Sequence, residues 1–188
     1  MRASEYAAAV SAELRDTLAA LDDAQVDALA QMVVDAKRVF LSGAGRSLLM
    51  AKCCAMRLMQ LGLTAFVVGE TTTPAITAAD LLIAVSGSGE TAGIVCMAQK
   101  ARSAGARLAL ITIVPDSSAG RLADAVVRID ASSTKVASAQ ARSSVQLGGG
   151  LFELSALLVL EALVMQVAEK RGIEEPNVLL MRNHANLE

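Results

Sequence analysis

Five short apolar runs, separated along the chain by turns and helix-length stretches, dictate the fold class. Within each run the residues are apolar at consecutive rather than alternate positions, which indicates strands that are buried on both faces. The runs cover residues 38–42, 65–68, 80–86, 107–114 and 125–129. Strands that alternate with helices form parallel sheets with right-handed crossovers. We therefore predict an α/β fold in three layers, a five-stranded parallel sheet flanked by helices.

Both ends of the chain are predicted to be helical. Residues 1–36 have the pattern of two helices that pack on the main domain, residues 37–188, and we expect a single structural domain. Asp22 followed by Gln25 predicts a capping box at the start of the second helix. A long apolar helix is expected over residues 151–170, with a short helix beyond it.

Charge and hydropathy argue against two classes of partner. The formal net charge is −2, and Lys and Arg are scattered rather than clustered, so we expect no nucleic-acid partner. No run reaches the roughly 18 uninterrupted apolar residues of a membrane span. The most apolar stretch, residues 151–168, is interrupted by Glu153 and Glu161. We therefore expect no membrane partner.

The cysteines and the amino terminus indicate the cytoplasm. Cys53, Cys54 and Cys96 form neither a disulfide framework nor a spaced set of metal ligands, and they are interpreted as small apolar side chains in a reducing compartment. Residues 1–5 are not followed by an apolar signal core, which argues against secretion. No metal site is expected.

Two loops rich in glycine and serine follow predicted strands directly and open helices. They are Ser-Gly-Ala-Gly-Arg-Ser at residues 42–47 and Ser-Gly-Ser-Gly-Glu-Thr at residues 86–91. Unpaired N–H groups at a helix N-terminus attract anions, and hydroxyls add further donors. If the strand order is 2-1-3-4-5, both loops face the crevice where that order reverses. This predicts a phosphate site, although the same residues also serve simply as turns and helix caps.

A dinucleotide-binding fold is the rival interpretation of the first loop. Gly43 and Gly45 begin a G-x-G-x-x-G pattern, and Glu70 lies at the end of the second predicted strand. Leu48, however, occupies the third glycine position, where it should crowd the helix against the strand. That interpretation also gives no role to the second loop, so it ranks second.

Several stretches together resemble the SIS (sugar isomerase) domain family, and in particular its 6-phospho-3-hexuloisomerase members. They are residues 43–47, 55–59, 68–75, 86–91, 151–153 and 184–188. The resemblance implies an isomerase that converts D-arabino-hex-3-ulose 6-phosphate, a phosphorylated ketohexose, to fructose 6-phosphate through an enediolate. In the family this step belongs to the ribulose monophosphate route of formaldehyde fixation. The resemblance further implies a homotetramer, and this chemistry requires no cofactor.

The resemblance also assigns substrate contacts to single residues. It implies phosphate contacts from the hydroxyls of the two loops and charge neutralisation by Arg46, for which a solvent-exposed helix residue is the alternative. The expected substrate-binding residues are Gly45, Arg46, Ser47, Ser86, Gly87, Ser88, Gly89, Glu90 and Thr91.

Glu153 is the expected catalytic base. Moving a proton between neighbouring carbons needs one carboxylate that burial allows to exchange protons near neutral pH. Glu153 shares a helical stripe with Leu157, Leu160 and Val164, and an acidic residue on an apolar face costs stability unless it has a partner or a role. The alternative is a solvated carboxylate at the start of its helix.

His184, the only histidine, is the second expected catalytic residue, with an idle or structural histidine as the alternative. In related SIS isomerases a histidine can come from a neighbouring subunit, and His184 could do the same. Residues 131–149 are expected to form an active-site cover. Lys135 or Arg142, within that cover, could stabilise the enediolate.

Two other functions remain open from the sequence. One is a different sugar-phosphate isomerase with the same loops. The other is a non-catalytic sugar-phosphate sensor, since SIS domains also occur in regulators. A sensor would be expected to carry a DNA-binding segment, and no basic extension resembling a helix-turn-helix is visible in the sequence.

Overall fold

The fold is a parallel sheet between two layers of helices. The computed structural model describes residues 1–134, 136 and 144–187. The strand order is β2-β1-β3-β4-β5, and every neighbouring pair is parallel. The strands are β1 (Val39–Gly43), β2 (Ala65–Val67), β3 (Leu81–Val85), β4 (Arg107–Thr112) and β5 (Ala125–Arg128). The predicted fold class is confirmed, and the strand order is the one under which both loops face the same crevice.

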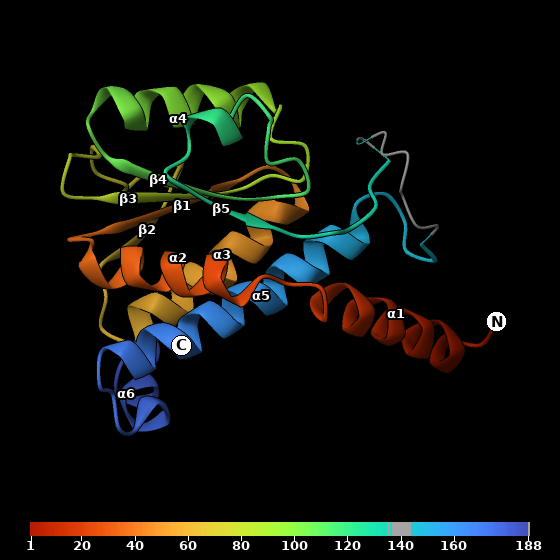
Figure 1. Ribbon diagram of the computed structural model, residues 1–188. Helices are drawn as coiled ribbons and strands as arrows, with labels where there is room; N and C mark the ends of the chain where they lie inside the picture. Colours follow the sequence, from red (N-terminus) through yellow and green to blue (C-terminus); the bar gives the residue numbers. More distant parts are fainter. Residues whose placement is uncertain (135, 137–143, 188) are drawn as a thin grey trace.

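The helices divide between the two faces of the sheet. Figure 1 shows α4 and the short η1 turn above the sheet and α2, α3 and α5 below it, while α1 extends away from the body. The elements are α1 (Ala3–Leu18), α2 (Asp23–Asp35), α3 (Arg46–Gln60), α4 (Ala92–Ser103), η1 (Gly120–Leu122), α5 (Gly150–Lys170) and α6 (Pro176–Arg182).

Each face of the sheet has its own apolar core. In β1, Leu41 belongs to the larger core, between the sheet and helices α2, α3 and α5. Its neighbour Phe40 belongs to the smaller core, between the sheet and α4. In β3, Ile83 and Leu82 divide in the same way. Successive side chains of a strand point to opposite faces, so a strand covered on both sides must be apolar at every position. This is why the apolar runs are continuous.

Helix α5 is a core helix. In the part of the chain that the structure describes, it is the one helix long and apolar enough to cross a membrane. Of its most apolar 18-residue window, 56% is buried inside the protein. Val159, Leu163 and Val167 are fully buried in the larger core. The hydropathy of α5 is therefore explained by packing against α2 and α3.

The start of α2 differs from the prediction. Asp22 caps the helix as expected, because its Oδ1 accepts a hydrogen bond from Ala24 N at 3.0 Å. The capping box with Gln25 is wrong, since Gln25 Oε1 instead accepts from the backbone N of Arg128 at 2.8 Å. β5 is an edge strand with unpaired backbone N–H groups. The side chain of Gln25 accepts from one of these groups, on Arg128, and not from the start of its own helix. The contact ties α2 to the edge of the sheet.

Candidate active site

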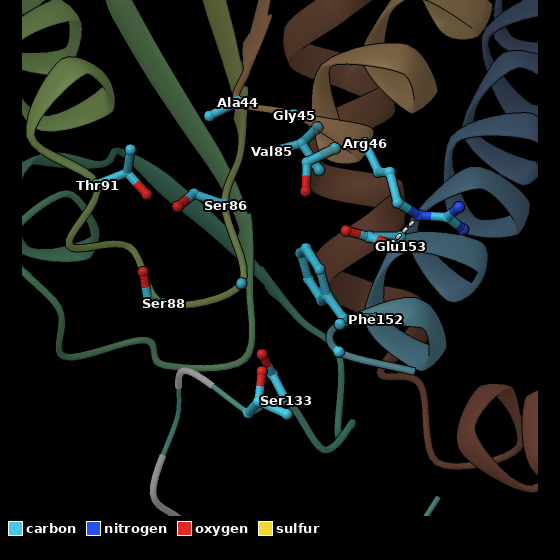
Figure 2. Close-up of a pocket in the computed structure, with 15 residues that line it drawn as sticks. Ala44, Gly45, Arg46, Val85, Ser86, Ser88, Thr91, Ser133, Phe152 and Glu153 are labelled. Atoms are coloured by element: carbon cyan, nitrogen blue, oxygen red, sulfur yellow. Dashed lines mark hydrogen bonds and ion pairs between the residues drawn. The ribbon is translucent and has the colours of Figure 1, made fainter. Parts of the chain in front are cut away.

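A cavity of about 320 Å³ lies at the carboxyl ends of β1 and β3, where the strand order reverses. Ligands bind at this position in open parallel sheets. Figure 2 shows its lining side chains, which come from four segments of the chain. The lining residues are Ala44, Gly45, Arg46, Ser47, Val85, Ser86, Gly87, Ser88, Thr91, Ser133, Thr134, Gly148, Gly149, Phe152 and Glu153. Seven of the nine predicted substrate-binding residues are among them.

The first loop joins β1 to α3 through two glycines. A Cβ on Gly43 would lie 2.7 Å from Leu48 N, so only glycine lets the first turn of α3 pack this closely on the strand. Gly45 precedes α3 with a φ of 58°, a left-handed conformation that glycine adopts without strain. Ser47 is buried in that first turn and lines the cavity. The loop thus turns the N-terminus of α3 toward the pocket.

The second loop places three hydroxyls around the same space. Ser86 Oγ accepts from Gly89 N and Ser88 Oγ accepts from Glu90 N, each at 3.2 Å, so the serines also shape the turn. Thr91 is the N-cap residue of α4, and its side chain makes no capping hydrogen bond within the described structure. Figure 2 shows Ser86, Ser88 and Thr91 on the side of the cavity opposite Arg46 and Glu153. Hydroxyls beside two helix N-termini form a suitable site for a phosphate.

Gly89 and Glu90, which are expected to bind substrate, are not among the residues that line the cavity, and both contact the turn after β4. A Cβ on Gly89 would lie 1.9 Å from Ser117 Oγ, so the loop packs directly on the turn after β4. Glu90 Oε1 accepts from Ser118 N at 2.7 Å. This backbone hydrogen bond holds the pKa of Glu90 below its usual range. The charge of Glu90 is therefore directed at the supporting turn, away from the cavity.

Glu153 lies in the first turn of α5 and faces the cavity. Its side chain is 16% exposed, and its Oε2 accepts a hydrogen bond from Arg46 Nε in an ion pair. Leu160 and Val164, farther along the predicted stripe, are buried in the larger core. The carboxylate is thus mostly shielded from solvent and lies beside a cation. This supports its expected role more than that of a solvated helix-end residue.

Phe152 and Ser133 line the cavity, although no role was expected for either side chain from the sequence. The ring of Phe152 lies against Gly87, where an added Cβ would approach Cδ1 to 3.2 Å. Ser133, Thr134, Gly148 and Gly149 come from the two ends of the expected cover and line the pocket. The one available signal was the unusual composition of residues 131–149. Lys135 and Arg142, named as candidates for enediolate stabilisation, lie outside the described residues.

His184 does not line the cavity of its own chain. It follows α6, where Asn183 Nδ2 donates to the carbonyl oxygen of Gln60 at 3.0 Å. Gln60 is the last residue of α3, and the cavity lies at the first turn of that helix. At about 1.5 Å per residue, the two ends of α3 are roughly 20 Å apart. A catalytic role for His184 therefore requires a second copy of the chain. In the described part of the structure, no three His, Cys, Asp or Glu residues group as metal ligands.

The family follows from comparison with known proteins. Residues 32–147 match the family model of the SIS domain, so the chain belongs to the SIS domain family. Within it, the chain is similar to proteins named 3-hexulose-6-phosphate isomerase. The protein from Mycobacterium gastri is 46% identical over 176 residues, which cover 94% of this chain and 86% of that protein. The protein from Bacillus subtilis is 39% identical over all 188 residues and the whole of both chains.

Comparison of structures agrees. A solved structure of a hypothetical protein from Methanococcus jannaschii superposes with a TM-score of 0.81 and 29% sequence identity. The match covers 98% of this chain and 99% of that chain, for which a function of 3-hexulose-6-phosphate isomerase has been inferred. The predicted family is confirmed, and the dinucleotide-binding interpretation of the first loop is set aside.

Proposed function

We propose that the protein is a 6-phospho-3-hexuloisomerase, which interconverts D-arabino-hex-3-ulose 6-phosphate and fructose 6-phosphate. One observation carries this function. A single cavity holds a cluster of neutral phosphate donors on one side and a largely buried carboxylate on the other. Relatives at up to 46% identity are named for this reaction.

The phosphate is proposed to bind between the two loops. Ser47, Ser86, Ser88 and Thr91 supply hydroxyls, and the N-termini of α3 and α4 supply backbone donors and the positive ends of two helix dipoles. Gly45 and Gly87 allow the backbone to approach the phosphate closely. This anchor fixes one end of an open-chain sugar, so that its other carbons extend toward Glu153.

Glu153 is proposed to move the proton. In the forward direction its carboxylate removes the hydrogen of C2, and the electron pair forms a C2=C3 double bond as O3 gains negative charge. The O2 proton then passes to O3, and the protonated Glu153 returns its proton to C3, which makes C2 the new carbonyl carbon and C3 a hydroxyl-bearing carbon. One carboxylate can serve both carbons, since they are neighbours. Arg46, beside Glu153, supplies positive charge close to the oxygens on which the enediolate charge develops.

A second subunit is proposed to complete the site. His184 lies at the surface and outside the cavity of its own chain, and it can transfer protons to or from the sugar oxygens only if another chain presents it. Exposed apolar side chains on α3, α5 and α6 support an assembly, which we propose is a homotetramer. They include Met56, Met59, Leu158, Met165, Val178 and Met181. We place the enzyme in the cytoplasm, on the ribulose monophosphate route of formaldehyde fixation.

A coupled assay tests the proposed reaction. Hexulose 6-phosphate is generated enzymatically, and fructose 6-phosphate is measured as it forms. Formation at a rate that scales with the protein is the expected result. An inactive protein that still binds phosphosugars would favour a different sugar or the sensor function.

A further inference from the structure

The helix that extends from the body of the protein binds, through a single carboxylate, the segment that leads into one wall of the pocket. Glu13, on α1, accepts three hydrogen bonds from consecutive residues that are more than 130 positions away. Its Oε1 accepts from Val145 N at 2.8 Å, and its Oε2 accepts from Ser144 Oγ at 2.7 Å and from Gln146 Nε2 at 3.0 Å. Figure 1 shows α1 reaching toward the segment that enters α5.

The bound segment leads directly into the site. Leu147 O accepts from Gly150 N at 3.0 Å, and Gly149 O accepts from Glu153 N at 3.0 Å. Gly148 and Gly149 line the cavity between these contacts. A short series of backbone hydrogen bonds therefore connects the residues held by Glu13 to the residue proposed as the base.

Besides the hydrogen bonds already named, a long one from Thr134 N to Gly148 O, at 3.4 Å, holds the segment. Gly148 is left-handed, with a φ of 63°, and Gly149 and Gly150 follow it, so this stretch is intrinsically free in its backbone. Gln146 Oε1 is buried without a hydrogen-bond partner in the described structure, so its amide is held through its Nε2 donation to Glu13. Removing the carboxylate would also take away the acceptor of the Gln146 amide nitrogen.

Glu13 is itself fixed and charged. It is half-buried on α1, beside the buried Thr17 and Leu14, which packs against the larger core. Burial would raise the pKa of Glu13, but hydrogen bonds from Val145, Gln146 and Ser144 outweigh it and hold the pKa below its usual range. The side chain is therefore a charged acceptor at neutral pH, the form that three donors require.

We propose that Glu13 is a positioning residue for the active site. It acts through residues 144–146 to fix Gly148, Gly149 and the first turn of α5. Only the expected loss of kcat rests on the proposed function. The structural consequence, an ordered segment from residue 147 to residue 153, is independent of the sugar.

The test compares Glu13→Gln and Glu13→Ala with Asp16→Asn, a charge-removing change on an exposed part of the same helix. In Glu13→Gln one acceptor oxygen becomes a donor, so at least one of the three bonds is lost. With hexulose 6-phosphate, well below the melting temperature, kcat of both Glu13 variants should fall roughly tenfold or more, since small displacements of reacting groups are costly. KM should change less, because the phosphate loops are untouched. Asp16→Asn should match wild type.

Two further measurements test whether Glu13 acts through Gln146 and the residues that follow it. Gln146→Ala should lower kcat, and adding it to Glu13→Ala should cost less than the sum of the two single changes, because the residues are coupled. Hydrogen exchange over residues 147–153 should accelerate in Glu13→Ala and remain unchanged in Asp16→Asn. Unchanged exchange there, or additive losses in the double variant, would overturn the proposal. If wild type is inactive but exchange accelerates, the positioning role stands and the proposed reaction fails.

Discussion

Arg46 Nε donates to Glu153 Oε2 across 107 positions of sequence, joining the first residue of α3 to the first turn of α5. Arg46 belongs to the loop proposed to bind phosphate, and Glu153 is the residue proposed to move the proton. The ion pair therefore fixes the distance between the two halves of the site before a ligand arrives. A preset spacing of this kind favours reaction, since less ordering remains to be done on binding.

Glu153→Gln should abolish turnover and preserve substrate binding. The amide is nearly isosteric with the carboxylate but cannot accept the C2 proton, so kcat should fall on the order of 10³-fold, a typical effect of losing a general base. Steady-state assays and calorimetric binding measure the two properties. Glu161→Gln is the matched control, two turns along the same helix and outside the cavity. Retained turnover in Glu153→Gln would remove Glu153 from its role.

Thr91→Val should weaken binding with little effect on kcat. The substitution keeps the shape of the side chain and removes one hydroxyl donor, which contributes about 1.5–3 kcal/mol when its partner is charged. KM should therefore rise roughly tenfold or more. Ser103→Ala, at the exposed far end of α4, should leave KM unchanged. An unaltered KM in Thr91→Val would place the phosphate elsewhere in the cavity.

Mixing two inactive variants should restore activity if His184 acts from a neighbouring subunit. We expect His184→Ala alone to lose most activity. Random reassociation with Glu153→Gln would then create sites that carry both native residues, and activity should recover to about a quarter of the wild-type rate in a symmetric pairing. Light scattering checks that the assembly is intact. A wild-type rate in His184→Ala would end this role, as would a monomeric mass.

Acid should destabilise the protein through Asp80. Asp80 Oδ1 accepts from Arg38 Nε at 2.9 Å, and Oδ2 accepts from Arg38 Nη2 at 2.6 Å. These bonds, with those from Thr77, lower the pKa of Asp80 from 3.8 to about 2. Because the folded pKa lies below the unfolded one, the stability is fully present above pH 5 and is lost as pH falls toward 2.

The shift corresponds to about 2 kcal/mol, measurable as the pH dependence of the free energy of unfolding in urea. Asp80→Asn should flatten that dependence between pH 5 and 2. Asp35→Asn, an exposed control, should retain it. Equal slopes in wild type and Asp80→Asn would contradict the assignment.

The parallel sheet and both loops could be predicted because their signals are local. Buried strands impose consecutive apolar residues, and turns onto helices impose glycine. The first loop shows where such a rule misleads. Leu48 was expected to crowd the helix against the strand, but the close approach is made by its backbone on Gly43, and its side chain is only half-buried. The close packing of α3 on β1 therefore requires glycine at position 43, at the end of the strand, and it tolerates leucine at position 48.

The contacts that could not be predicted join residues far apart in sequence. Gln25 has a local capping role by pattern, yet its partner is Arg128 on β5. Glu90 stands in a phosphate-loop motif, yet its carboxylate binds Ser118. Neither partner has a periodic or compositional signal. A polar side chain with several possible partners bonds to the group that tertiary packing leaves unpaired. That group can be identified only in the folded chain.

The cavity is assembled from parts with separate origins in the chain. The loops after β1 and β3 are proposed to bind the phosphate that all phosphosugars share, while Ser133, Thr134 and Gly149 line another part of the same cavity. Selectivity among sugars is thus open to redesign, by exchanging the second set of residues in a scaffold whose anchor stays intact. A library confined to those positions would explore new substrates and spare the proposed base, since none of the three belongs to the sheet, to α5 or to an apolar core.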